Sequence, residues 1–442
     1  MAPRVDPVTS DETLPARTGV VVIGGGIIGT CTAFYLAKKG VPVVVCEKGH
    51  IAGEQSSRNW GWCRKMGRDP REIPLAIEAL RLWGEMNEAV GAETGYRRCG
   101  IIYLCKTPED LAKKTAWLEA AQPYQLDTRL ITGAEAKEKL PGLAGAWAGA
   151  LYTESDGRGE PQMAAPAIAE AARRLGAGIV TQCAVRGIET KGGKVSGVVT
   201  EKGRIACDAV VLAGGAWSSL FCGNSGIRLP QLKVLSSVMR TEPLPGGPET
   251  SASGGDFGFR KRLDGGYNIG GWSANVFDLT WDTFKFLSDF MPTIRTQHDN
   301  VRLRIGRGFI EDWQIPRRWS LDETSPFERV RTLDPEPYQP ILDGAKQAIG
   351  GAFPALKDVR VAERWGGMID VTPDIVPVIS GVDAMEGFFI ATGFSGHGFG
   401  IGPGAGRLMA DLVTGDTPVV DPGEFRFSRF TDGSRPGPSP MA

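Results

Sequence analysis

The chain has 442 residues with 50 basic and 51 acidic side chains, and both signs are scattered along its length. We therefore expect no nucleic-acid-binding face and a small molecule as the main partner. The eight cysteines form no C-x-x-C pair, a pattern typical of reduced thiols in a cytoplasmic protein without structural zinc. No apolar run reaches the roughly 20 residues that a transmembrane segment requires, and the polar first 18 residues lack the order of a signal peptide.

The chain opens with a predicted strand, helix and strand. Residues 19–23 (GVVVI) form the short apolar run of a buried parallel strand, and residues 27–39 follow as an apolar helix ended by Gly40. Residues 41–47 (VPVVVCE) return as a second strand. Together they make a complete βαβ unit within about 30 residues.

Three glycines with G-x-G-x-x-G spacing lie where the first strand meets the helix. Gly24 permits a tight turn, Gly26 lets backbone N–H groups approach a pyrophosphate, and Gly29 lets the helix pack on the strand. Glu47 ends the next strand, 18 residues after Gly29, where a carboxylate accepts from ribose hydroxyls. The pattern predicts a dinucleotide site, which also includes the neighbouring Ile27, Ile28 and Lys48.

Further elements alternate along the rest of the chain. Helices are predicted at 74–90, 109–121 and 161–175. Short apolar strands separated by glycine-rich turns are predicted at 101–105, 179–185, 195–200, 209–213 and 387–391. Period-two patterns predict an antiparallel sheet over the substrate from 236–241, 256–263 and 267–272.

A second glycine-rich segment points to a flavin. Residues 393–400 (GFSGHGFG) precede a helix that runs to Thr414, so another set of backbone N–H groups faces an anion. A flavin needs this second site because its reduced ring carries negative charge near N1 and the C2 carbonyl. The segment contributes Gly393, Gly396, His397, Gly398, Phe399 and Gly400 to the predicted cofactor site. Polar and aromatic side chains nine residues after Glu47 add Ser56, Ser57, Arg58, Asn59 and Trp60.

Four blocks of sequence resemble the D-amino-acid oxidase-like family of FAD oxidoreductases, which includes glycine oxidase, sarcosine oxidase and D-amino-acid dehydrogenase. They lie in family order over nearly the whole chain. The blocks are VVVIGGGIIG at 20–29 with Glu47, SSRNWGW at 56–62, DAVVLAGGAWS at 208–218, and WGGMIDVTPDIVPVIS at 365–380 with ATGFSGHGFGIGPGAGRLMADLV at 391–413. The resemblance implies that Val185 lies at the adenine, that Ala213 to Trp217, including Gly214, line the dinucleotide, and that Gly396 to Phe399 cover the flavin pyrimidine.

The chain also departs from the family pattern. Gly367 stands where sarcosine oxidase has a cysteine bonded to the flavin, and no histidine lies within 56–62, so we predict non-covalent FAD. Ile369 and Gly400 stand at two positions where relatives carry a cation for the substrate carboxylate. Another cation must replace them, and by motif position the candidates are Arg64, Arg260 and Arg262.

Four side chains are candidates for the reaction itself. His397 lies beside the flavin in the family, and we favour that placement over proton transfer. Asp370 either holds a cationic amine or caps a turn, and Arg64 binds substrate, FAD phosphate or only surface acids. Asn268 aligns with a cap lysine that promotes reaction with oxygen in sarcosine oxidase. A neutral amide there predicts a dehydrogenase that passes electrons to a quinone or a carrier protein more readily than to O2, unless Lys261 or His397 supplies the charge.

The sequence thus predicts an α/β fold: a Rossmann-type FAD-binding domain like that of glutathione reductase, with an inserted α+β substrate cap built on an antiparallel sheet. We assign the first domain to 15–225 and 345–420 and the cap to 226–344, with part of 74–160 contributing. The remaining residues are predicted loose termini, at 1–14 and 421–442.

The implied reaction is oxidation of the CH–NH bond of an amino acid or amine to the imine, by hydride transfer to flavin N5. The alternatives are an FAD-binding subunit of a multi-component amino-acid or opine dehydrogenase and a non-catalytic flavoprotein assembly factor.

Overall fold

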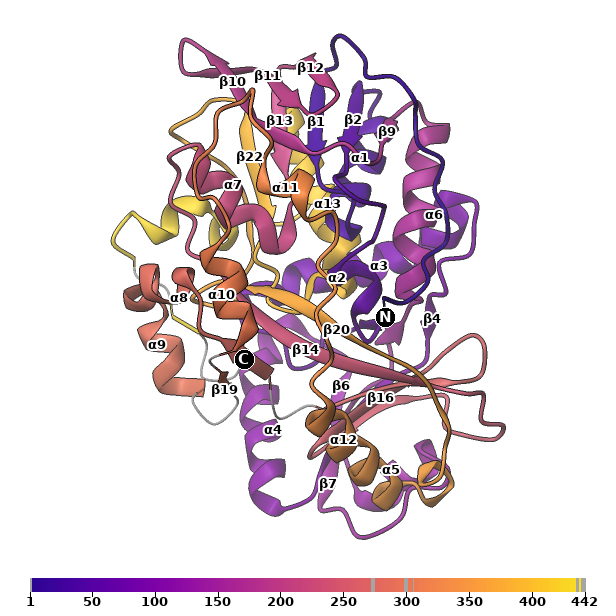
Figure 1. The fold of residues 1–442 in the computed structure, drawn as a ribbon. Helices are drawn as coiled ribbons and strands as arrows, with labels where there is room; N and C mark the ends of the chain where they lie inside the picture. The colour runs from indigo at the N-terminus through magenta and orange to yellow at the C-terminus, as the bar shows by residue number, and fades with distance from the viewer. Residues whose placement is uncertain (1, 272–274, 298–300, 305, 435–436, 439–442) are drawn as a thin grey trace.

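The computed structural model describes residues 2–271, 275–297, 301–304, 306–434 and 437–438. Figure 1 shows a parallel sheet with helices on its faces in the upper half and a large curved sheet in the lower half. The long strands β14 and β20 cross between the two halves. No helix of the described residues is both long and apolar enough to cross a membrane.

The upper sheet has the strand order β21-β22-β13-β1-β2-β9. All neighbours pair in parallel except β21, which runs antiparallel to β22. Its strands are β1 (Val20–Ile23), β2 (Val43–Cys46), β9 (Gly178–Val180), β13 (Ala209–Leu212), β21 (Val378–Gly381) and β22 (Phe388–Thr392). The central strands β1, β2 and β13 are valine-rich and fully buried, as strands covered on both faces must be.

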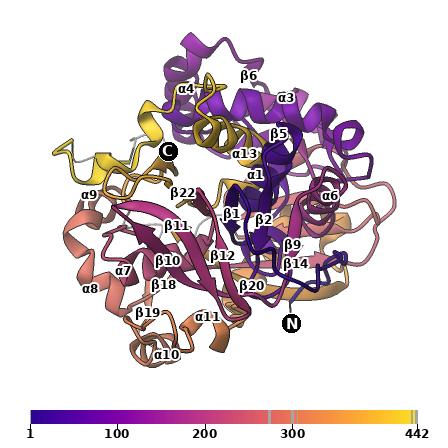
Figure 2. The same cartoon turned by 90° about the horizontal axis from the view of Figure 1, so that it is seen from above.

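Alternate residues of β1 pack into two separate hydrophobic cores, one on each face of the sheet. Val20 and Val22 pack with the helices α1 (Ile27–Lys38), α3 (Ile73–Val90), α6 (Pro161–Arg174) and α13 (Gly398–Thr414). Val21 and Ile23 pack on the other side with α7 (Ser218–Asn224) and the antiparallel meander β10 (Val185–Lys191), β11 (Lys194–Thr200) and β12 (Gly203–Ala206). Figure 2 shows the meander and the α1, α6 and α13 helices on either side of β1 and β2. The N-terminus of α1 is thereby fixed at the carboxyl edge of the sheet.

The predicted strand at 179–185 is in fact two strands in different sheets. β9 ends at Val180 and β10 begins at Val185. Between them Gln182 has a φ of 48°, a left-handed conformation that turns the chain out of the parallel sheet. The segment is apolar on both sides of this turn, so its composition predicts burial but does not predict the turn.

The lower sheet has ten strands and is mixed, whereas the sequence predicted an antiparallel sheet. β5 and β15 pair in parallel, as do β18 and β19. β5 and β15 lie far apart in the chain and are not joined by a hairpin, so they can pair in either the parallel or the antiparallel direction. The strands are β5 (Ile101–Cys105), β6 (Thr128–Ile131), β7 (Gly149–Thr153), β14 (Leu232–Thr241), β15 (Ser251–Gly254), β16 (Phe257–Lys261), β17 (Tyr267–Gly270), β18 (Asn275–Asp278), β19 (Val301–Arg304) and β20 (Val361–Val371).

This sheet draws on three parts of the chain. β5 to β7 come from 74–160, and β20 comes from the segment assigned to the FAD-binding domain at 345–420. β20 pairs with β14 from Leu232 opposite Val371 to Thr241 opposite Val361. The long pair therefore joins the two halves of the molecule, and the division into two domains stays a prediction.

Shorter elements complete the fold. A small sheet has the order β3-β8-β4, with β3 at Trp62–Cys63, β4 at Arg97–Arg98 and β8 at Gly157–Arg158. The other helices are α2 (Gln55–Arg58), α4 (Pro108–Ala121), α5 (Gly133–Lys139), α8 (Trp281–Lys285), α9 (Leu287–Gln297), α10 (Arg307–Trp313), α11 (Pro326–Arg329) and α12 (Gln339–Ala352). Short 3-10 turns lie at Pro70–Glu72, Gln122–Tyr124, Gly215–Trp217, Pro354–Leu356, Gly423–Phe425 and Phe427–Phe430.

The described parts of both chain ends pack on the fold, although the sequence predicted loose termini. The Asp11 carboxylate accepts from the backbone N–H of Ile179 at 2.8 Å. Near the other end Phe425 is buried and Arg429 forms a buried ion pair with Asp374 at 2.9 Å. A single buried aromatic or ion pair in a polar segment gives no periodic signal, which is why the sequence did not reveal these contacts.

Candidate active site

A cavity of about 450 Å³ lies where the carboxyl edge of the parallel sheet meets β14 and β20. Most of the predicted site residues come together on its wall. They are Gly24, Gly26, Ile27, Ile28, Glu47, Lys48, Ser56, Arg58, Asn59, Trp60, Arg64, Val185, Ala213, Gly214, Trp217, Gly367, Asp370, Gly396, His397, Gly398, Phe399 and Gly400. Four predicted residues are not on the wall: Gly29, Ser57, Asn268 and Gly393.

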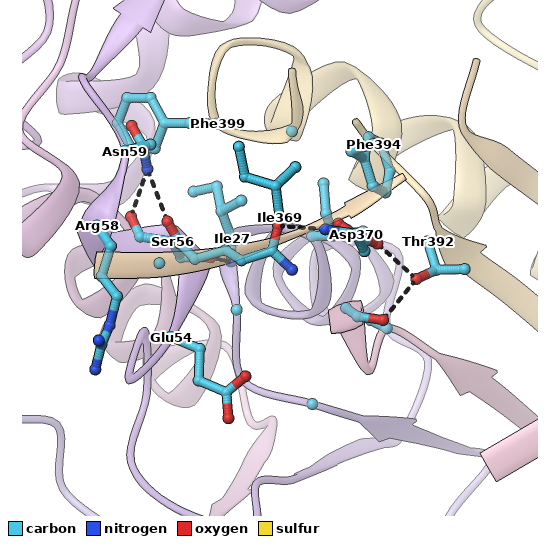
Figure 3. Close-up of a pocket in the computed structure, with 18 of the residues that line it drawn as sticks. Ile27, Glu54, Ser56, Arg58, Asn59, Ile369, Asp370, Thr392, Phe394 and Phe399 are labelled. Atoms are coloured by element: carbon cyan, nitrogen blue, oxygen red, sulfur yellow. Dashed lines mark hydrogen bonds between the residues drawn. The ribbon is translucent and has the colours of Figure 1, made fainter. Parts of the chain in front are cut away.

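The N-terminus of α1 opens into this cavity without a side-chain cap from its own N-cap residue, Gly26. The hydroxyl of Ser56, on α2, instead accepts from the backbone N–H of Ile27 at 2.8 Å. A Cβ at Gly26 would lie 3.0 Å from that hydroxyl. The backbone N–H groups at the start of α1 and the Ser56 hydroxyl thus form a site of the kind that binds a pyrophosphate. Figure 3 shows Ile27 and Ser56 beside each other where the β20 ribbon passes.

Glu47 directly follows β2, and its carboxylate is held by two backbone N–H groups. Gly25 donates to Oε2 at 2.6 Å and Gly49 donates to Oε1 at 2.7 Å. Burial raises the pKa of Glu47 above its usual value, although these two donors and Lys48 oppose the shift. An oriented, half-buried carboxylate directly after the second strand fits a ribose diol.

Glu54 bonds two predicted residues of the wall, and the sequence did not reveal it. Its carboxylate accepts from Lys48 at 2.7 Å and from the indole N–H of Trp217 at 3.0 Å. The Lys48 ammonium also lies 4.6 Å from the centre of the Trp217 ring. A lone glutamate in a loop carries no motif, so only the folded structure reveals this cluster.

His397 occupies the N-cap position of the second open helix end, that of α13. Its Nδ1 lies 2.8 Å from Oε2 of the fully buried Glu72. Burial lowers the pKa of His397 to about 4, and nearby Arg68 adds to the shift. Burial alone would raise the pKa of Glu72, but His397 and Arg68 outweigh it and the pKa falls below its usual value. At neutral pH a neutral imidazole therefore donates to a carboxylate.

Asp370 lies on β20 and accepts three hydrogen bonds at one oxygen. The donors are the backbone N–H of Gly393 at 2.7 Å, Gln231 at 3.1 Å and Thr392 at 3.1 Å. Figure 3 shows Asp370 pointing to Thr392, away from Ile27 and Ser56. Burial raises the pKa of Asp370. Of the two roles the sequence left open, these bonds favour the anchoring of a turn, and contact with the substrate stays a prediction.

Gly367 and Arg58 form the wall where β20 passes α2. A Cβ at Gly367 would lie 3.2 Å from the Arg58 Cβ. The Arg58 guanidinium donates through Nη1 to Asp334 at 2.7 Å and to the Gly366 carbonyl at 2.9 Å. This end of the guanidinium therefore binds protein partners.

Trp60, which lines the cavity, packs against β16 and β17 of the large sheet. A Cβ at Gly258 or Gly270 would clash with the Trp60 ring, so both positions require glycine. Asn268 lies on the same strand as Gly270 but is buried, and its side-chain oxygen accepts from Arg262 at 3.1 Å. The predicted lysine-equivalent position thus lies beside a cation and not on the cavity wall.

Two of the three predicted carboxylate-binding cations lie elsewhere. Arg260 is fully buried and bonded to Glu160 at 2.7 and 2.9 Å, and Arg262 bonds Asp264 at 3.0 Å. Neither lines the cavity, whereas Arg64 does. Arg68, which the sequence analysis missed, lines it as well.

The donor set of the cavity fits FAD. Two open helix ends, an oriented carboxylate and aromatic walls face one cavity, as a flavin dinucleotide requires. Among the described residues no group of three His, Cys, Asp or Glu side chains is arranged to hold a metal ion.

The model of the DAO family, FAD dependent oxidoreductase, matches residues 19–412. The chain belongs to this family. The L-amino acid deaminase of Proteus myxofaciens, solved with anthranilate, is 37% identical and superimposes with a TM-score of 0.94, over 98% of each chain.

Two curated relatives match over most of their own length. Glycine oxidase of Pseudomonas putida is 26% identical, over 92% of this chain and 97% of the relative. Sarcosine oxidase subunit beta of Rhodobacter capsulatus is 26% identical, over 94% and 89%. The chain spans about half the length of other relatives, namely 47% of 4-methylaminobutanoate oxidase from Paenarthrobacter nicotinovorans and 43% of mouse mitochondrial sarcosine dehydrogenase.

Proposed function

We propose that this chain is an enzyme that oxidises the CH–NH bond of an amino acid to the imine, with FAD as its cofactor. The observation that carries the proposal is the single cavity faced by two open helix ends and the Glu47 carboxylate. The likeness to an L-amino acid deaminase and to glycine oxidase supports an amino acid over a simple amine.

FAD supplies the hydride acceptor when it is bound. The chain's own contribution is to position the substrate and to exclude water. Trp60 and Phe399 give the cavity apolar walls, and Trp60 packs edge-on against Trp62 with ring centres 5.3 Å apart. The N-terminus of α13 presents its N–H groups where negative charge develops.

The reaction does not depend on His397 as a base. With a pKa near 4 and Nδ1 turned to Glu72, the imidazole is a weak proton acceptor at neutral pH. Glu72 and His397 instead act as a buried pair that positions the first turn of α13. Because the substrate enters as the neutral amine, we expect the pH profile to follow the substrate's own amine.

The electron acceptor is part of the proposal. A wall formed by the Trp60 ring, with no lysine among the lining residues of that face, favours a quinone or carrier protein over O2. Arg262, which directly follows β16, donates to the Asn268 side-chain oxygen at 3.1 Å and places a cation beside that position. Reoxidation of the reduced protein by air should therefore be slower than by a dye, and equal rates would contradict this acceptor assignment.

A dye-coupled assay tests the activity itself. The purified yellow protein is mixed with an artificial electron acceptor and a panel of L-, D- and N-methyl amino acids. We expect dye reduction together with a 2-oxo acid and ammonia, or methylamine from an N-methyl substrate. Dye reduction without an oxo product would contradict CH–NH oxidation.

A multi-subunit enzyme is the second candidate, and the likeness to a sarcosine oxidase subunit beta favours it. In that case the isolated chain is reduced by substrate but passes electrons on only when its partner subunit is present. Purification of the tagged chain from its native host, followed by the same assay, distinguishes the two.

A further inference from the structure

Residues 330–338 connect α11 to α12 without helix or strand, and we call this segment the strap. Figure 1 shows α11 in the upper half of the molecule and α12 in the lower half. Both ends of the strap, Val330 and Tyr338, have extended backbones. Its sequence VRTLDPEPY favours an extended chain between them, because a proline disfavours the helical conformation in the residue before it, here Asp334 and Glu336.

The upper end of the strap is bonded to Lys48 and to the meander. The Lys48 ammonium donates to the carbonyl oxygens of Val330 at 3.0 Å and of Arg331 at 2.9 Å. The Arg331 guanidinium in return donates to the Lys48 carbonyl at 3.0 Å and pairs with Glu201, with Nη2 2.6 Å from Oε2. A Cβ at Gly49 would lie 2.5 Å from the Arg331 carbonyl oxygen, so the strap lies directly against the backbone after Lys48.

The middle of the strap is bonded to the segment that contains α2. The backbone N–H of Leu333 donates to Glu54 Oε1 at 3.0 Å, and the Asp334 carboxylate accepts from Arg58 Nη1 at 2.7 Å. The Arg58 side chain is 1% exposed, whereas that of Asp334 is 46% exposed. The strap thus supplies the acid that neutralises a buried arginine, and an uncompensated buried charge is costly.

The lower end of the strap packs on the two long strands. A Cβ at Gly366, on β20, would lie 2.5 Å from the Pro335 carbonyl oxygen. The backbone N–H of Tyr338 donates to the hydroxyl of Ser237, on β14, at 2.8 Å. Both strands also contribute residues to the cavity wall, so the strap follows the outside of the cavity along its length.

The bonds of the strap go to residues of the cavity wall. Lys48, Glu54 and Arg58 all line the cavity, while none of the described strap residues does. Glu54 also accepts from the indole N–H of Trp217, another residue of the wall. The strap is therefore an outer layer that ties wall residues 48–58 to the meander and to β20.

We propose that Arg331 and Asp334 are positioning residues of the FAD site, which hold this part of the wall closed over the dinucleotide and so slow the release of FAD. The inference depends on FAD binding and not on the substrate proposed above. Opening of the wall breaks the bonds of the strap to Lys48, Glu54 and Arg58 together, which makes such an opening rare.

The rate at which the FAD-loaded protein loses its flavin tests the proposal without turnover. The protein is diluted, and the flavin retained with it above an ultrafiltration membrane is measured over time. Asp334→Asn should raise the release rate about 3- to 10-fold, because the amide leaves the buried Arg58 without its acid. Arg331→Gln, which loses the pair with Glu201, should raise it by a similar factor.

Glu336→Gln is the matched control. Glu336 is an exposed acid of the same strap, and its side chain makes no hydrogen bond or ion pair with the described residues. The control should release FAD at the wild-type rate. Wild-type release in both Asp334→Asn and Arg331→Gln would overturn the proposal, as would an equal increase in all three variants. If Arg331→Gln does not fold, Asp334→Asn decides, because its side chain is half exposed.

Trypsin cleavage of the same FAD-loaded proteins separates strap opening from general loosening. Cleavage after Arg331 requires the strap to leave Lys48 and Glu201, whereas Lys191 lies in the exposed turn between β10 and β11. In Asp334→Asn, cleavage after Arg331 should accelerate by about the same factor as FAD release, with cleavage after Lys191 unchanged. Faster strap cleavage without faster FAD release would overturn the proposal, and so would equal acceleration at both sites.

Discussion

Gly26 is the residue on which the pyrophosphate site depends most directly. Its backbone is extended, with φ of −74°, a conformation that any residue can adopt. Glycine is needed there because a side chain would lack room. A valine at this position would place branched carbons against the Ser56 hydroxyl, 3.0 Å from the Cβ, and fill the cradle. Gly26→Val should therefore abolish FAD binding, measured as bound flavin per protein.

Gly84→Val provides the control, because nothing lies within 4 Å of a Cβ at that helical position. It should keep one flavin per chain. A Gly26→Val protein that also keeps one flavin would show that the phosphates lie elsewhere.

His397 makes a prediction about pH. Its pKa is about 4 in the native protein and 6.5 as the ordinary value, so between these pH values the unfolded chain binds a proton that the folded chain does not. Stability contributed by this group is therefore present above pH 6.5 and is lost as the pH falls toward 4. The slope is at most one proton, roughly 1.4 kcal/mol per pH unit. The lowered pKa of Glu72 acts in the same direction.

Urea unfolding at pH 5 and pH 7.5 measures this effect. The loss of stability at pH 5 should be smaller in His397→Gln than in the wild type, because glutamine does not titrate. An identical loss in both proteins would place the pH dependence on other groups.

At the residue scale, the sequence predicted those site residues that belong to a local motif. The spacing of Gly24, Gly26 and Gly29 with Glu47 predicts a dinucleotide site, and the fold places Gly24, Gly26 and Glu47 on the wall of one cavity. Arg68 and Glu72 were missed because their significance arises only when α13, more than 300 residues later, packs against them. No local pattern distinguishes a buried arginine from a surface one.

At the scale of elements, the Arg260–Glu160 ion pair connects β16 to the start of α6. Both side chains are buried, with N to O distances of 2.7 and 2.9 Å. Arg260 also donates to the Trp60 carbonyl, so the pair fixes the aromatic wall of the cavity. Removing one partner leaves an uncompensated buried charge. Glu160→Gln should destabilise the protein by about 3 to 5 kcal/mol.

The double variant Glu160→Met with Arg260→Met serves as control, since two apolar side chains leave no buried charge. It should be more stable than either single variant in urea unfolding. If the double variant loses as much stability as the two single variants together, the pair stabilises the protein by packing and not by charge.

Element identity was largely predictable and strand pairing was not. The helix over α3, predicted from residue 74, begins one residue earlier, and β5 has its predicted bounds. Periodicity within a segment reports which face is buried, but it does not say which distant strand lies alongside. The parallel pairing of β5 with β15 and the full-length pairing of β20 with β14 both join segments more than 100 residues apart, which explains the mixed sheet.

At the scale of the whole molecule, we predict that FAD is bound without a covalent link. Gly367 stands beside Arg58 at the position where a cysteine would be needed, and Cys46 is the one cysteine among the described lining residues, at the far end near Glu47. Acid denaturation should release all the yellow colour into the supernatant as free FAD. Colour retained in the washed precipitate would show a covalent bond.

The central claim is that an amino acid delivers its hydride to the flavin in the cavity between the two halves. Anaerobic mixing of the FAD-loaded protein with a panel of amino acids and amines, followed by flavin absorbance, tests it most directly. At least one amino acid should bleach the flavin, more slowly when its α-carbon carries deuterium. A flavin that dithionite bleaches but no member of the panel reduces would contradict the claim and favour a non-catalytic flavoprotein.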